Sequence, residues 1–84
     1  MKKDPTLLLT GIDSAIVGWI HRTGDVPIVI YDRAKVVKHF VKDGMTEDEA
    51  EEWVSFNVEG AWVGKGTPGL LHRGGVEKVK EVLG

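Results

Sequence analysis

The chain has no cysteine among its 84 residues, which excludes disulfides, thiolate nucleophiles and cysteine-based zinc sites. Small secreted domains usually depend on disulfides, so this absence favours a reducing compartment, and we expect a cytoplasmic protein. No apolar run approaches the about 20 residues of a membrane-spanning helix. The leucines at 7–9 also fall short of the ~7–15 apolar residues in a signal peptide. We therefore expect a soluble protein without a membrane partner.

A concentrated basic surface is missing as well. Thirteen acidic residues outnumber eleven basic ones, and the formal net charge is −2 at pH 7. A nucleic-acid-binding protein normally carries a basic stripe, because contacts to phosphate supply much of its affinity. The lysines and the arginine of the segment 33–42 instead fit the outer face of a helix. We therefore do not expect nucleic acid as the main ligand.

The sequence also lacks a recognisable catalytic or metal-binding arrangement. His21, His39 and His72 show no spacing that is typical of metal ligands. The carboxylates of the segment 47–52 fit a solvated helix start rather than a catalytic pair. A small hydrolase would need a nucleophile or a base pair, and none can be identified. We therefore expect no metal, no cofactor and no enzymatic activity.

The length predicts a single domain, residues 1–84, with a core at 6–72 and a helical tail at 73–84. Residues 15–21 alternate with apolar side chains on both faces, which predicts a central strand covered on both sides. The turn that follows and the apolar run 26–31 complete an antiparallel hairpin. Three shorter strands are predicted at 6–9, 61–63 and 70–72.

Two helices are marked by their caps. Asp32 is suited to begin the first helix, and Gly44 is suited to end it. Thr46 and Glu49 match a capping box at the start of the second helix, and Gly60 would end that helix. These elements predict an α+β fold: a small, mainly antiparallel sheet with two central helices packed on it and a short C-terminal helix.

A glycine-rich loop at 64–69 is the first candidate for ligand binding. It satisfies the pattern G-x-G-x-x-G, but strand-like sequence follows where the dinucleotide fingerprint requires a helix. Gly60 also lies one residue too close to Gly64 and Lys65 for a P-loop. The backbone N–H groups of such a loop, together with Lys65, can still bind an anion. The alternative is a purely structural turn.

Asn57 is the second candidate, because helical spacing places its amide on the apolar face of the second helix. A buried amide needs hydrogen-bond partners. Asn57 therefore either hydrogen-bonds the backbone of the 61–67 loop or faces a pocket and contacts a ligand. The three tryptophans are many for a small core, and tryptophan is common at binding hot spots and as a stacking surface.

Several short motifs together resemble a known family. They are Tyr31-Asp32, Gly44-Met45, Glu49-Ala50, Asn57-Val58, Gly60-Ala61-Trp62-Val63-Gly64 and Thr67-Pro68. In this combination they resemble a family of small, largely uncharacterised bacteriophage proteins, over about residues 8–71, with Asp48 where the family has Glu. The resemblance implies an accessory protein that acts inside an infected bacterium and inhibits a host enzyme or antagonises host defence. It supplies no catalytic residues.

The residues and the resemblance together lead to a functional hypothesis. We interpret the protein as a non-enzymatic phage accessory protein that sequesters a small anionic, nucleotide-like host signalling molecule. The predicted ligand site consists of Asn57, Trp62, Lys65, Gly66 and Thr67. The alternative is an inhibitor that binds a host protein through an exposed aromatic patch. The thin core and the tryptophans also predict a homo-oligomer, in which a symmetric partner covers apolar surface.

Overall fold

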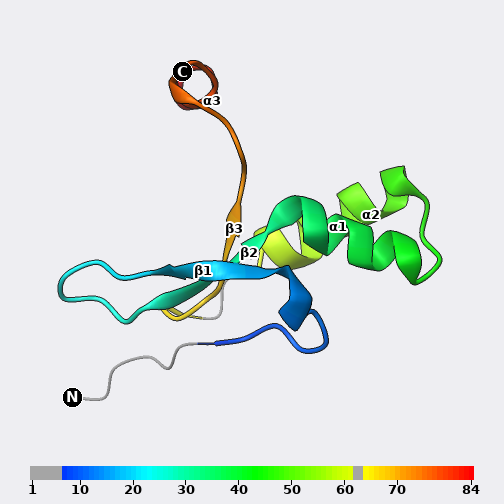
Figure 1. Cartoon of the computed structure of the whole chain (residues 1–84), viewed down its shortest axis with the longest axis horizontal. Helices are drawn as coiled ribbons and strands as arrows, with labels where there is room; N and C mark the ends of the chain where they lie inside the picture. The colour runs from blue at the N-terminus through cyan, green and yellow to red at the C-terminus, as the bar shows by residue number, and fades with distance from the viewer. Residues whose placement is uncertain (1–6, 62–63) are drawn as a thin grey trace.

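The computed structural model describes residues 7–61 and 64–84 (Figure 1). The elements follow one another as η1 (Asp13–Ala15, a 3-10 turn), β1 (Ile16–Ile20), β2 (Ile28–Asp32), α1 (Arg33–Lys42), α2 (Glu47–Val54), η2 (Ser55–Glu59, a π-helical turn), β3 (Gly69–Leu71) and α3 (Val76–Leu83). A three-stranded sheet with two central helices and a short C-terminal helix is an α+β fold. This confirms the predicted fold class.

The sheet has the strand order β1-β2-β3, so β2 lies in the centre. β1 and β2 form the predicted antiparallel hairpin, in which Trp19 lies opposite Val29. β2 and β3 run parallel, with Tyr31 opposite Leu70. The sheet is therefore mixed, with one antiparallel and one parallel pair.

β1 is an edge strand, and the prediction that this strand is central and covered on both sides is wrong. Trp19 is 73% exposed and Ile20 is 53% exposed, whereas Tyr31 in β2 is fully buried. Apolar side chains on both faces are typical of a covered strand. They do not determine which strand has a neighbour on each side, and β3 pairs with β2 instead of β1.

Side-chain caps begin both central helices, as predicted. Oδ1 of Asp32 accepts hydrogen bonds from the backbone nitrogens of Ala34 and Lys35, at 3.0 and 3.4 Å. Thr46 and Glu49 exchange the two bonds of a capping box, at 3.2 and 3.0 Å. These bonds satisfy N–H groups that have no partner inside the first helical turn. The caps therefore fix where the chain turns from β2 into α1 and from the loop into α2.

The core lies where β2 meets the two central helices. Its buried members are Ile12, Ala15, Tyr31, Val36, Val37, Ala50 and Val54. The hydroxyl of Tyr31 accepts a hydrogen bond from the backbone nitrogen of Leu9 at 2.8 Å. This bond ties the segment that precedes η1 to the middle of the sheet.

The outcome for the three short predicted strands differs. The strand at 70–72 exists as β3, shifted by one residue. Residues 7–9 are not a strand, although the backbone nitrogen of Leu7 donates to the carbonyl of Gly66 at 3.0 Å. Of the segment 61–63, only Ala61 is described, and it lies outside any strand.

α3 stands apart from the rest of the fold (Figure 1). The radius of gyration is 14.0 Å, whereas a compact chain of this length has about 12 Å. None of the residues of α3 is buried, and Leu83 is 81% exposed. Among the described residues, no helix is both long and apolar enough to cross a membrane.

Candidate functional site

Charged side chains from four elements meet where β2 and β3 end. We call Asp32, Arg33, Glu51, Glu59, His72 and Arg73 the charged cluster. Because β2 and β3 are parallel, their carboxyl ends lie at the same edge of the sheet. The residues that follow each strand are therefore brought together, although many positions separate them in the sequence.

Arg33 is the centre of the charged cluster, and all three of its guanidinium nitrogens donate hydrogen bonds. Nη1 donates to Glu51 and Nε donates to Glu59, both at 2.5 Å. Nη2 donates to the hydroxyl of Ser55 at 3.0 Å. The bonds to Glu59 and Glu51 raise the pKa of Arg33 above its ordinary value. The guanidinium thus joins the start of α1 to both α2 and η2.

Asp32 is the buried carboxylate of the charged cluster. While Oδ1 caps α1, Oδ2 accepts two hydrogen bonds from Arg73, at 3.1 Å from Nε and 2.6 Å from Nη2. The hydrogen bonds from Arg73 are the main reason why the pKa of Asp32 is lowered. The cap predicted from the sequence is confirmed, and the same carboxylate also fixes the chain after β3.

Glu59 completes the charged cluster by accepting hydrogen bonds from two sides. His72 Nε2 lies 2.8 Å from its Oε2, and Arg33 binds its Oε1. Partial burial by itself raises the pKa of Glu59, but the hydrogen bonds from Arg33 and His72 outweigh it and lower the pKa. The cluster places two arginines and a histidine beside three carboxylates. Its arginines are therefore engaged by protein carboxylates rather than directed at an external anion.

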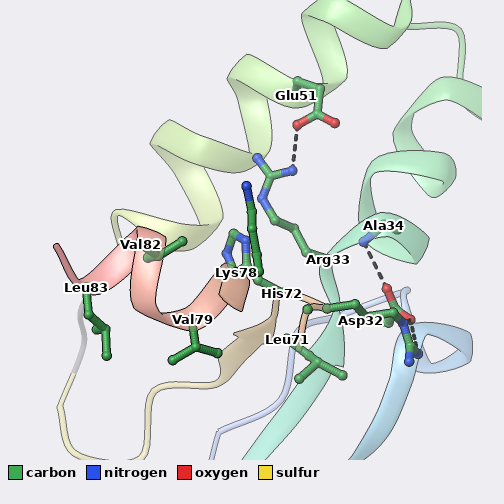
Figure 2. Close-up of a pocket in the computed structure, with 12 residues that line it drawn as sticks. Asp32, Arg33, Ala34, Glu51, Leu71, His72, Lys78, Val79, Val82 and Leu83 are labelled. Atoms are coloured by element: carbon green, nitrogen blue, oxygen red, sulfur yellow. Dashed lines mark hydrogen bonds and ion pairs between the residues drawn. The ribbon is translucent and has the colours of Figure 1, made fainter. Parts of the chain in front are cut away.

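A cleft of about 490 Å³ separates the charged cluster from α3 (Figure 2). One wall is apolar and is formed by Leu71 and by the α3 side chains of Val79, Val82 and Leu83. Arg33 and Glu51 line the opposite side, and Lys78 reaches across from α3. The cleft therefore combines an apolar wall with a charged one.

A second cavity, of about 310 Å³, lies on α2 and η2. Its lining residues are Met45, Glu49, Glu52, Trp53, Phe56 and Asn57. Trp53 is 44% exposed and Phe56 is 76% exposed. Large apolar side chains beside two carboxylates thus form a hollow on the surface of the helix.

Asn57 lines this second cavity, but it is exposed, so the prediction of a buried inner-face amide is wrong. Its Nδ2 donates to the backbone carbonyl of Trp53, one turn earlier, at 3.2 Å. The helix widens to π geometry at Ser55, and the extra residue per turn rotates the positions that follow. The apolar spacing of α2 therefore does not extend to Asn57.

The glycine-rich loop is a closed turn. Both the backbone nitrogen and the hydroxyl of Thr67 donate to the carbonyl of Gly64, at 3.1 and 2.6 Å. Gly66 is buried, and its carbonyl accepts from Leu7. Lys65 is exposed, and Trp62 lies outside the described residues.

The described members of the predicted site, Asn57, Lys65, Gly66 and Thr67, do not line one cavity together. Asn57 lines the cavity on α2, while none of the described loop residues 64–69 lines that cavity or the cleft. Among residues 7–61 and 64–84, no three His, Asp or Glu side chains are grouped to hold a metal ion. Sequence analysis missed His72 and Arg73. Their signal is a basic pair directly after a strand, and it becomes visible only once β3 is known to be parallel to β2.

No protein-family model, curated protein or solved structure matches this chain. The resemblance to a bacteriophage family therefore stays a prediction.

Proposed function

We propose that the protein is a non-enzymatic binding protein that attaches to a host protein by strand addition at β1. The observation that carries this proposal is the position of β1 at the sheet edge, with large apolar side chains exposed. Trp19 is the most exposed large residue of β1, and Ile20 follows it. An edge strand presents backbone N–H and C=O groups that an extended segment of a partner can pair with.

The composition of β1 also favours pairing. Natural edge strands are commonly protected by lysine, proline, inward-pointing charge or a β-bulge. Ile16–Ile20 contains no lysine, proline or charged residue. The register is irregular between Ile16 and Gly18, which disturbs the strand near its start. The proposed partner strand therefore adds beside Gly18–Ile20, with the indole of Trp19 as the anchor.

The charged cluster supports a binding role more than a catalytic one. Its arginines are held by protein carboxylates. The hydroxyl that Arg33 contacts is that of Ser55. Among the described contacts, no histidine or carboxylate is hydrogen-bonded to this hydroxyl. Catalysis by a serine requires an activating base within hydrogen-bond reach. The cluster is therefore proposed to hold β2, β3 and the helices in place behind the binding strand.

Sequestration of a small nucleotide-like molecule is the second candidate. The observation that favours it is the cleft of about 490 Å³, which falls within the ~300–1,000 Å³ that is typical of small-molecule sites. Lys78 lies along it and supplies a cationic group. In this second candidate function, the ligand binds in the cleft beside α3 and not at the 64–69 loop that the sequence predicted.

Matched variants separate the two candidates. Trp19→Ser should abolish capture of the host partner from lysate, whereas Val82→Ser, at an equally exposed position of α3, should leave it intact. If Val82→Ser abolishes capture and Trp19→Ser does not, the binding site is not β1.

A thermal-shift series with cyclic dinucleotides tests the second candidate. A ligand that binds only the native state, at a hundredfold excess over Kd, adds about 2.7 kcal/mol to the free energy of unfolding. A shift that Lys78→Ala removes would favour sequestration.

A further inference from the structure

α3 carries an apolar stripe that is bordered by lysines. At about 100° per residue, four residues share one face of the helix: Val76, Val79, Val82 and Leu83. Lys80 borders this face on one side and Lys78 on the other, while Glu77 and Glu81 lie on the opposite face. All four apolar side chains are half exposed or more. The stripe is therefore built to pack against an apolar surface with acidic borders.

The hollow on α2 and η2 has this complementary character. Trp53 and Phe56 supply exposed aromatic surface, and Glu49 and Glu52 supply carboxylates beside it. These four residues line one cavity, so they lie on the same side of α2 and η2. An apolar centre with carboxylates beside it matches an apolar stripe with lysines beside it.

We propose that α3 of one copy of the chain packs into this hollow on a second copy, and that the exchange is reciprocal in a two-fold dimer. Lys78 and Lys80 then approach Glu49 and Glu52 of the second copy. Pairing of α3 with α3 of another copy is disfavoured, because the lysine borders of the two helices would face each other. The inference does not depend on the proposed binding at β1.

The tether of α3 explains why the acceptor belongs to a second copy. Arg73 is fixed to Asp32, so only Gly74 and Gly75 link the fixed chain to α3, and the three residue steps from Arg73 to Val76 span at most about 11 Å. Glu51 lines the cleft next to α3. At about 100° per residue, Glu51 lies roughly 160° around α2 from Trp53. The aromatic hollow therefore faces away from the side of α2 on which α3 is tethered.

Sedimentation velocity of the full chain tests the exchange. We expect the wild-type protein to form a dimer of twice the 9.2 kDa chain mass at micromolar concentrations. Val82→Asp and Phe56→Asp should each weaken the dimer at least about tenfold, since each introduces a charge into the apolar contact. Glu77→Gln, on the polar face of α3, should leave it unchanged. Both aspartate positions are exposed in the single chain, and circular dichroism checks that the variants fold.

Charge reversal and mixing test which surfaces meet. Glu52→Lys and Lys80→Glu should each weaken the dimer about two- to fivefold per contact, and the two changes in one chain should restore it. A mixture of Val82→Asp and Phe56→Asp chains retains one intact contact of the two and should form a heterodimer more tightly than either forms a homodimer. This result would support a reciprocal exchange.

Three results would overturn the proposal. The wild-type chain could remain a monomer throughout the micromolar range. A dimer could form that Val82→Asp and Phe56→Asp do not affect but Trp19→Ser does, which would place the contact at β1. The chain could stay monomeric and bind vesicles with anionic phospholipid through α3, with Val82→Asp abolishing that binding. Trp19→Ser should still form the dimer even where it no longer captures the host protein, because the proposed dimer contact does not include β1.

Discussion

Arg73 donates two hydrogen bonds to Oδ2 of Asp32, which lies 41 positions earlier in the chain. One carboxylate thus caps α1 through Oδ1 and holds the end of β3 through Oδ2. The parallel pairing of β2 with β3 places both residues at the same edge of the sheet. The chain segments that precede α1 and α3 are therefore joined by this ion pair as well as by the backbone pairing of β2 with β3.

The first prediction concerns acid. The bonds from Arg73 lower the pKa of Asp32 below its ordinary value of 3.8, and the pKa values of Glu49 and Glu59 are lowered as well. A carboxylate with a lowered pKa in the folded state stabilises the fold above its unfolded pKa, and this contribution is lost as pH falls through the folded pKa. We expect the free energy of unfolding to fall below about pH 4.

Urea unfolding at a series of pH values measures this dependence. Arg73→Ala should lower the stability near neutral pH and flatten the decline in acid, since Asp32 then loses the partner that lowers its pKa. Arg22→Ala is the control, because Arg22 is an exposed arginine near the β1–β2 turn. Equal pH profiles for Arg73→Ala and the wild-type protein would show that the Arg73–Asp32 pair does not contribute to the pH dependence of stability.

The second prediction concerns the start of α2. Thr46→Ala removes the acceptor for the backbone nitrogen of Glu49 and should reduce the free energy of unfolding by about 1 kcal/mol. Thr23→Ala, in the exposed turn of the hairpin, should have little effect. Chemical denaturation compares the two variants. A loss at Thr23 as large as that at Thr46 would contradict a specific role for the cap.

The third prediction concerns the buried hydroxyl of Tyr31. Tyr31→Phe keeps the ring in the core but leaves the backbone nitrogen of Leu9 without its acceptor. We expect a loss of about 1 kcal/mol, the usual cost of one removed hydrogen bond. Hydrogen exchange should show faster exchange of the Leu9 amide in the variant. An unchanged Leu9 amide would mean that this hydrogen bond is not formed in solution.

Local signals predicted the parts of the fold that depend on neighbours in sequence. The cap at Asp32, the capping box at Thr46 and the hairpin each depend on residues a few positions apart, and all are present. A short-range pattern is enough for these elements because their hydrogen bonds join nearby backbone groups. The fold class follows from the same elements.

Long-range pairing set the rest. The parallel partner of β2 is the three-residue strand β3, which lies after the helices, so β1 became the edge rather than the centre. The charged cluster depends on the same pairing of β2 with β3. The spacing of apolar residues within a single segment does not indicate which strands pair. The prediction that Asn57 is buried was wrong for a local reason, since the change to π geometry at Ser55 interrupts the helical spacing.

Amide hydrogen exchange of the chain with and without the proposed partner protein tests strand addition at β1 most directly. We expect those amides of residues 18–20 that point away from β2 to exchange much more slowly in the complex, because new backbone hydrogen bonds protect the open edge. Amides of β2 are already paired on both sides in the free protein and should change little. Unchanged exchange at residues 18–20, with new protection confined to another surface, would contradict the proposed binding edge.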